Sequence, residues 1–158
     1  MSNMKSLIAG AVLLAALAAP AASGAQNRGD ASRAPVQYGA DAGEYTPDGF
    51  ALRGRAEVTQ GGNRLRANAI QGFTANGDLT RVEATGDVYF VTPEQSMRGD
   101  RAVYTLGDGN VVVTGDVILT QGQNVLTGGR LVYNVRTETA RMESSGARVR
   151  GVFYPQGN

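Results

Sequence analysis

The chain has 158 residues, with 22 glycines, no cysteine, no histidine, no tryptophan and a formal net charge of +1. The missing cysteine and histidine exclude disulfides, thiolate or imidazole metal sites, and every nucleophile–histidine pair. A net charge so close to zero gives no bulk attraction to nucleic acid. We therefore expect no enzyme, no cofactor, no bound metal and no nucleic-acid partner.

The first residues have the pattern of a secretory signal peptide. Lys5 is followed by the apolar stretch Leu7–Ala19, by Pro20 and by the small residues Ser23-Gly24-Ala25. The apolar stretch is shorter than the roughly 20 residues that a membrane-spanning helix needs, and small residues precede a cleavage site. We expect residues 1–25 to be a cleaved signal peptide, with an uncleaved anchor as the alternative. The polar residues 26–34 are a predicted disordered lead-in, residues 35–154 one domain, and residues 155–158 a tail.

From residue 35 onward the pattern is that of β-strands. Short runs of alternating apolar and polar residues are separated by turn signals such as Gly61-Gly62-Asn63, Asn76-Gly77-Asp78, Asp108-Gly109 and Gly122-Gln123-Asn124. Asn-Gly and Asp-Gly pairs favour tight hairpins in which both residues have positive φ. The alternation is one-sided, which predicts an all-β domain of two facing, mainly antiparallel sheets.

A glycine-centred element recurs along the domain. Gly54, Gly86, Gly115 and the fainter Gly146 follow one another at steps of 32, 29 and 31 residues, each at the start of an apolar run. A period of this size predicts stacked repeats of one supersecondary unit. Asp87 and Asp116 directly follow two of these glycines, so we interpret them as turn or bulge residues rather than catalytic acids. Stacked β-units favour a long apolar trough over a compact catalytic pocket.

Alternation predicts which side chains share the inner face of the strands. It places Ala67 and Ala69 on the same face as Leu65 and leaves many inner positions to valine, alanine or glycine, so that a groove between the sheets is expected. The predicted groove residues are Val58, Leu65, Val88, Phe90, Met97, Val117, Leu119, Leu126, Leu131 and Tyr133.

Several segments together resemble a known family. They are Pro35–Asp41 (PVQYGAD), Gly54–Gly61 (GRAEVTQG), and the pair Met97–Tyr104 (MRGDRAVY) and Leu126–Tyr133 (LTGGRLVY). In their order and spacing, after a signal peptide, they resemble the LptA/OstA family of periplasmic lipopolysaccharide-transport proteins of Gram-negative bacteria. The second segment departs from the family pattern, because Arg55-Ala56 stands where the family has Asn-Val.

The resemblance implies an open, twisted β-jelly roll that acts as a carrier in the periplasm. Such a protein would bind the acyl chains of lipid A between its sheets and pass lipopolysaccharide from the inner to the outer membrane. Its implied partners are lipopolysaccharide, an inner-membrane protein of the same fold, the N-terminal domain of the outer-membrane translocon, and further copies of itself joined head to tail by edge strands. Arginines near the groove are candidates for contacts with lipid phosphates, namely Arg64, Arg66, Arg98 and Arg101.

Other functions remain open at this point. The chain could be a structural or scaffolding β-protein of the cell envelope, with a filled core and no ligand. It could also be the inner-membrane-anchored partner of the same transport system. An enzyme on a β-scaffold, acting for example on polysaccharide, would need an acid pair with a distinctive spacing, and the sequence contains none.

Overall fold

We describe the protein from a computed structural model, which covers residues 36–134, 137, 139–146 and 148–155. The predicted signal peptide, the lead-in and the last three residues of the predicted tail lie outside this range. All regular secondary structure in the described residues is β. The described part of the chain contains no helix that is long and apolar enough to cross a membrane.

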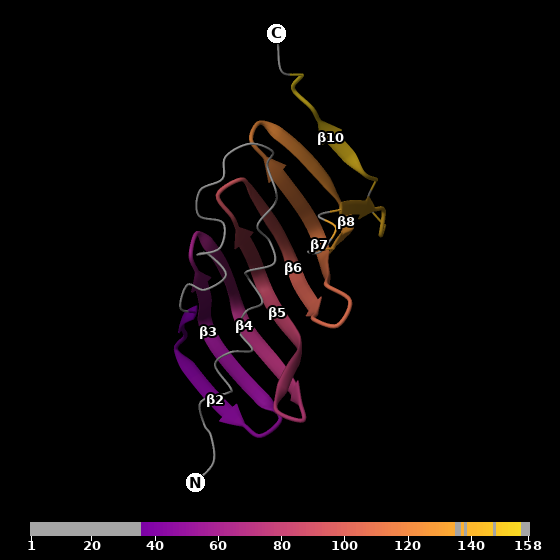
Figure 1. Cartoon of the computed structure of the whole chain (residues 1–158). Helices are drawn as coiled ribbons and strands as arrows, with labels where there is room; N and C mark the ends of the chain where they lie inside the picture. The colour runs from indigo at the N-terminus through magenta and orange to yellow at the C-terminus, as the bar shows by residue number, and fades with distance from the viewer. Residues whose placement is uncertain (1–35, 135–136, 138, 147, 156–158) are drawn as a thin grey trace, which may run out of the picture.

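Ten strands form the fold of the described residues. They are β1 (Val36–Gly39), β2 (Ala42–Thr46), β3 (Gly49–Gln60), β4 (Asn63–Ala75), β5 (Asp78–Val91), β6 (Gln95–Thr105), β7 (Asn110–Gln121), β8 (Asn124–Asn134), β9 (Thr139–Glu143) and β10 (Arg150–Val152). Strands β3 to β8 are joined to their neighbours as successive antiparallel hairpins. They lie one after another along the molecule, with β2 near one end and β10 at the other (Figure 1).

Three of the four recurring glycines form corners in the long strands, whereas Gly146, with a φ of 82°, lies outside the strands, between β9 and β10. The strand register shifts at Gly54-Arg55 in β3, at Gly86-Asp87 in β5 and at Gly115-Asp116 in β7. Both residues of each pair have positive φ, between 45° and 82°. In each hairpin, two residues of the odd-numbered strand oppose a single residue of the next strand, which defines a β-bulge and bends both strands. The interpretation of Asp87 and Asp116 as bulge residues is confirmed.

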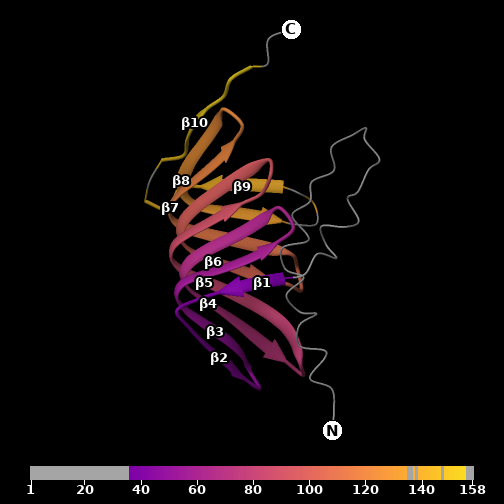
Figure 2. The ribbon, with the colours of Figure 1, turned by 90° about the vertical axis from the view of Figure 1, so that its left-hand side faces the viewer.

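The corners divide one hydrogen-bonded sheet into two layers. We define layer A as residues 42–54, 69–86, 101–115, 129–134 and 139–143, and layer B as residues 36–39, 55–67, 87–99, 116–128 and 150–152. Strands β2 and β9 form the two edges of layer A, whereas β1 and β10 form the edges of layer B. Figure 2 shows the corners of successive strands stacked along one side of the molecule.

The two layers face each other across a shared apolar core. Each of the two buried clusters combines side chains from both layers, for example Val113 and Leu131 of layer A with Val117 of layer B. A Cβ atom built on Gly99 of layer B would lie 2.5 Å from Val113 Cγ1 of layer A. The predicted all-β, antiparallel fold with facing sheets is confirmed, and the facing sheets are two halves of one continuous sheet that stays unclosed.

The bulges also change one predicted face. Ala69 was expected inside with Leu65 and Ala67, but it lies beyond the corner of β4, and its neighbour Ile70 is the buried residue, with 1% of its surface exposed. The expectation for Ala69 is wrong because the register shift between Arg66 and Ala69 moves every later side chain of β4 by one position.

The two predicted hairpin signals have different outcomes. Asn76 and Gly77 have φ values of 53° and 84°, so the tight β4–β5 turn is confirmed. The expectation for Asp108-Gly109 is wrong for Asp108, because only Gly109 has a positive φ there. In this wider β6–β7 loop, the Gly109 N–H donates to Thr105 O at 3.0 Å, and the Asp108 carboxylate accepts from the Asn110 N–H at 2.9 Å.

Candidate binding site between the layers

The inner face of layer B carries one continuous row of apolar side chains. Cross-strand pairing joins Val58 to Leu65, Leu65 to Phe90, Phe90 to Met97, Met97 to Leu119 and Leu119 to Leu126. These are six of the ten predicted groove residues. Side chains in register on one face of a sheet pack against each other, so the row forms an apolar floor across the strands.

The other four predicted residues also point inward. Val88 and Val117 lie beside the corners in layer B and have 2% and 1% of their surface exposed. Leu131 and Tyr133 lie in layer A, opposite the floor, and are 0% and 4% exposed. All ten predicted residues therefore share one interior, although only eight belong to the same layer.

The interior contains a small apolar cavity. Its volume is about 50 Å³, and it is lined by Leu65, Val82, Ala84, Val88, Phe90, Met97, Ala102, Tyr104, Val111, Val113 and Tyr133. A single water molecule needs roughly 10–15 Å³ of such space. The cavity therefore has room for only a few groups the size of a water molecule, and a long acyl chain would require the layers or their side chains to move apart.

Six of the eleven residues that line the cavity were missed by the sequence reading. Val82 and Ala84 of β5, Ala102 and Tyr104 of β6, and Val111 and Val113 of β7 line it from layer A. Their alternation was visible in the sequence. In β5 and β7 the period of two continues through the recurring glycine, from Ala84 to Val88 and from Val113 to Val117, so alternation alone could have placed these residues inside. In β6 the inner face changes between Met97 and Ala102, which alternation does not reveal.

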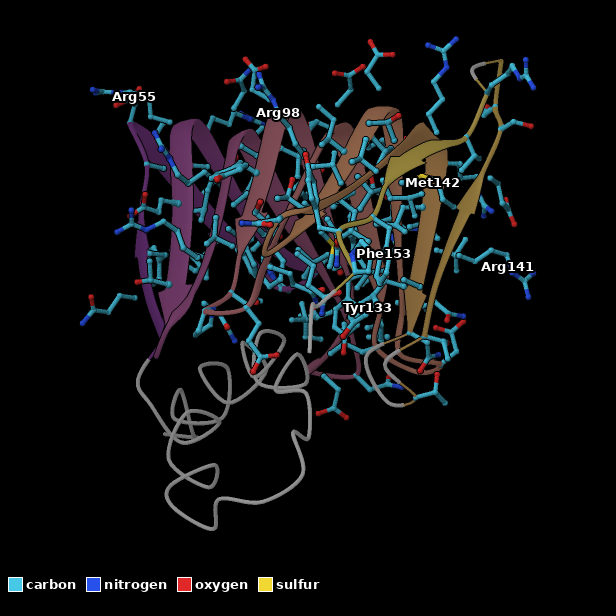
Figure 3. The ribbon with its side chains drawn as sticks, turned by 90° about the horizontal axis from the view of Figure 1, so that it is seen from above. Arg55, Arg98, Tyr133, Arg141, Met142 and Phe153 are labelled. Atoms are coloured by element: carbon cyan, nitrogen blue, oxygen red, sulfur yellow. The ribbon has the colours of Figure 1, made fainter. Side chains whose placement is uncertain are left out.

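The four arginines proposed for phosphate contact are exposed on the outer faces. Arg64 and Arg66 lie 3.8 Å and 3.6 Å from Glu57 Oε2, and Arg101 lies 2.7 Å from Glu83 Oε2. Arg98 forms no ion pair with any residue that the structure describes, and Figure 3 shows its side chain extending from the ribbon. Three of the four guanidinium groups therefore already have a carboxylate near them, and Arg98 is the one available for another anion.

An ion pair holds the first corner. Arg55 Nε donates to both carboxylate oxygens of Asp41, at 3.1 Å and 3.2 Å. This hydrogen bonding, together with the positive charge of Arg55, lowers the pKa of Asp41. A lowered pKa in the folded state means that the contribution to stability is present at neutral pH and is lost as the pH falls through the pKa of folded Asp41.

Aromatic side chains gather at the N-terminal end of the interior. The ring centroids of Tyr38 in β1 and Tyr45 in β2 lie 6.1 Å apart in an edge-to-face arrangement, with an interplanar angle of 62°. Tyr45 also contacts Phe50, at 6.3 Å between centroids. The Phe50 ring lies directly over Gly72, where a Cβ atom would come within 2.2 Å of it. The pKa of Tyr45 is raised to about 12. Partial desolvation is the larger cause, and hydrogen bonding with Tyr38 is the second.

The shifted pKa of Tyr45 leads to a measurable expectation. In an alkaline titration followed by ultraviolet absorbance, one tyrosine should ionise near pH 12, well above the ordinary pKa of 10.0. Because the folded-state pKa is raised, the stabilisation by this hydroxyl is complete below about pH 10 and is lost as the pH rises to about 12. The Tyr45→Phe variant should lack the late step, and the Tyr89→Phe variant should keep it. A late step that survives in Tyr45→Phe would contradict the assignment.

Other kinds of site find no support in the described residues. Nowhere in residues 36–134 and the shorter described segments do three acidic side chains come together as a metal site would require. Arg81 stacks over Phe73 with 4.2 Å between its Cζ atom and the ring centroid, and Arg130 pairs with Glu143 at 2.6 Å on the outer face. The apolar interior is therefore the candidate site.

Comparisons with known proteins agree with this picture. A family model described as LptA/(LptD N-terminal domain) LPS transport protein matches residues 40–139, which is more than half of the chain. An uncharacterised protein of Rhizobium meliloti (strain 1021) is 28% identical over 154 residues, covering 90% of this chain and 83% of the relative.

A solved structure has the same fold. It is the crystal structure of LptH from Pseudomonas aeruginosa, described as the LptA-homologous periplasmic component of the conserved lipopolysaccharide transport device. The match has a TM-score of 0.69 at 21% identity and covers 78% of this chain and 97% of LptH. With its recurring corners, its unclosed antiparallel sheet and the match over residues 40–139, the chain belongs to the LptA/LptD N-terminal domain family of lipopolysaccharide-transport proteins, which are transport proteins and not enzymes.

Proposed function

We propose that this protein is a periplasmic carrier that binds the acyl chains of lipid A between its two layers and passes lipopolysaccharide from the inner to the outer membrane. The observation that carries the proposal is the continuous apolar row from Val58 to Leu126, faced by the apolar residues of layer A. The row crosses the molecule from strand to strand, as a path for a long apolar ligand must. The predicted signal peptide supports a periplasmic location.

The energetics of acyl-chain burial fit such a carrier. Each buried methylene contributes about 0.8 kcal/mol, so a chain of about a dozen methylenes gains on the order of 10 kcal/mol. Part of this gain must offset the cost of opening, because the cavity of about 50 Å³ is much smaller than the ligand. The corners support an opening motion, since a bend about each Gly-Xaa pair changes the distance between the layers without breaking the strand pairing within a layer.

The outer arginines suggest where charged parts of the ligand are met. Of the four candidates, Arg98 best suits a phosphate group, because it is exposed and forms no ion pair with the described residues. Arg64, Arg66 and Arg101 would first have to break their ion pairs with Glu57 or Glu83 in order to bind a phosphate. A guanidinium group binds phosphate oxygens through two parallel hydrogen bonds, which makes arginine suited to this role.

The open sheet edges support end-to-end assembly. Strands β1 and β2 form one end of the sheet, and β9 and β10 form the other. Both strands at the first end run antiparallel to β3, and both strands at the second end run antiparallel to β8. The β1–β2 end of one copy can add antiparallel to the β9–β10 end of another, which extends both layers. Further copies, an inner-membrane partner of the same fold and the N-terminal domain of the outer-membrane translocon are the proposed partners.

A scaffold without a ligand is the second candidate function. The observation that favours it is the close packing of the interior, where Val88, Val117 and Leu131 are almost fully buried. In that case the layers would serve only to hold the end strands in place for assembly, and no lipid would enter between them.

Site-specific photocrosslinking separates these two functions. A photoreactive amino acid replaces Phe90 or Leu119 on the inner row, and in matched controls it replaces Thr59 or Thr120 on the outer face of the same layer. The carrier predicts lipopolysaccharide adducts at the two inner positions and none at the two outer positions. Folded protein without adducts at any of the four positions would contradict the carrier and favour the scaffold.

A further inference from the structure

The two ends of the apolar interior are built differently. At the C-terminal end, the inner row of layer B finishes at Gly151 of β10, which pairs with Leu126, and the inner rows of layer A finish at Ala140 and Met142 of β9. At the N-terminal end, the inner rows finish in two aromatic side chains. Tyr38 of β1 pairs with Val58 in layer B, and Tyr45 of β2 pairs with Phe50 in layer A.

The two tyrosines touch across the gap between the layers. Their ring centroids are 6.1 Å apart although the residues belong to opposite layers, and Tyr45 is backed by Phe50. They retain 59% and 61% exposure, and no further strand of the described residues covers them. Two large aromatic rings at the last pair of strands, in edge-to-face contact, therefore close the interior at this end.

The contact holds only while the layers are close together. Tyr38 is carried by the short edge strand β1 and Tyr45 by the short edge strand β2, and each is hydrogen-bonded to β3 on one side alone. Residues 40 and 41 and the corner at Gly54-Arg55 connect the two layers here, where Asp41 pairs with Arg55. An opening of the layers at this corner separates the rings, and a closing brings them back.

We propose that Tyr38 and Tyr45 form an aromatic gate at the N-terminal end of the interior, which must part for an acyl chain to pass lengthwise between this copy and the molecule docked on β1 and β2. The inference rests on the proposed carrier function and adds a gating role for the two tyrosines at the N-terminal end of the interior. The gate acts on lipid that passes from one copy to the next in an end-to-end assembly. Binding from the side of the interior, between the layers, does not require it to open.

The test is a transfer assay between two copies of the full-length protein. A donor copy loaded with purified lipopolysaccharide is mixed with an acceptor that carries a photoreactive residue at Phe90, and adduct formation on the acceptor is followed in time. A Tyr38→Cys/Tyr45→Cys variant is locked by a short bis-maleimide reagent, which is specific because the chain has no other cysteine. Locking should slow transfer at least tenfold and leave the amount of lipopolysaccharide bound at equilibrium within twofold of wild type.

A second variant tests the open gate. Tyr38→Ala/Tyr45→Ala should speed transfer several-fold with unchanged equilibrium binding, whereas Tyr38→Phe/Tyr45→Phe, which keeps both rings, should transfer at the wild-type rate. Tyr89→Ala, which removes an outward-facing tyrosine from β5, is the matched control and should have no effect. Locked and open variants that both bind lipopolysaccharide and transfer it at the wild-type rate would overturn the gate alone. Wild-type protein that binds no lipopolysaccharide would overturn the carrier function and the gate with it.

Discussion

Replacing Gly115 with alanine should lower the free energy of unfolding by about 2–4 kcal/mol, because it adds a left-handed backbone penalty to a steric clash. Gly115 has a φ of 82°, and a Cβ atom there would lie 2.2 Å from Asp100 Oδ2 and 2.6 Å from Asp100 Cβ. The Asp100 side chain packs over this corner and has to move. Urea unfolding followed by circular dichroism measures the loss.

Gly77→Ala is the matched control for this variant. Gly77 has nearly the same φ, 84°, but no atom of the described residues other than those of Gly77 and its two chain neighbours lies within 4 Å of the position that its Cβ would take. The control should therefore lose only the backbone penalty, about 1–2 kcal/mol. The difference between the two variants reports the close packing at the corner. Equal losses would mean that the Asp100 side chain yields freely and that the corner is not a packed feature.

Truncating Leu131 to alanine should destabilise the protein by about 2–5 kcal/mol. Leu131 is 0% exposed and lies in layer A within the buried cluster that also includes Val113 and Val117. The truncation removes buried methyl groups and leaves a void between the layers. Because a domain of this size is stable by only about 5–15 kcal/mol, a large share of the total would be lost. Chemical denaturation of both proteins, analysed with a common slope, provides the value.

Ile118→Ala is the control for the second prediction. Ile118 is a comparably large apolar residue in the neighbouring strand β7, but it points outward and is 38% exposed. Surface truncations cost little, so we expect a loss within about 1 kcal/mol. If Ile118→Ala proved as costly as Leu131→Ala, the outer face of layer B would have to be buried against something else, and the division into inner and outer faces would be wrong.

The sequence reading succeeded within each half-strand and failed across the corners. Alternation alone placed Val58, Phe90 and Leu119 on one face, because between bulges the side-chain period of a strand is two. It failed for Ala69, because β4 has one residue fewer than β3 at the corner, so that the inner face of β4 changes between Ala67 and Ile70. The position of that inversion in β4 has no sequence marker as clear as the recurring glycines, since Asn68 stands at the corner of that strand.

The remaining features depend on three-dimensional contacts. Tyr38 and Tyr45 lie on separate short strands, and their meeting follows from the folding of one sheet into two layers, which no local pattern encodes. Likewise, the ion pairs of Arg64 and Arg66 with Glu57 follow from the register between β3 and β4. The resemblance to the transport family was recognisable because several weak motifs occurred in the right order along the chain.

The corner-and-hairpin unit has a consequence for the size of the molecule. Each unit, such as β5 with β6 or β7 with β8, adds two strands to the stack, and neighbouring strands are about 4.8 Å apart. One repeat in the sequence thus lengthens the protein by roughly 9.6 Å and contributes its own share of the interior. Duplication or loss of one repeat therefore changes the length of the protein by a fixed amount. The cross-section and the strands at both ends stay unaltered.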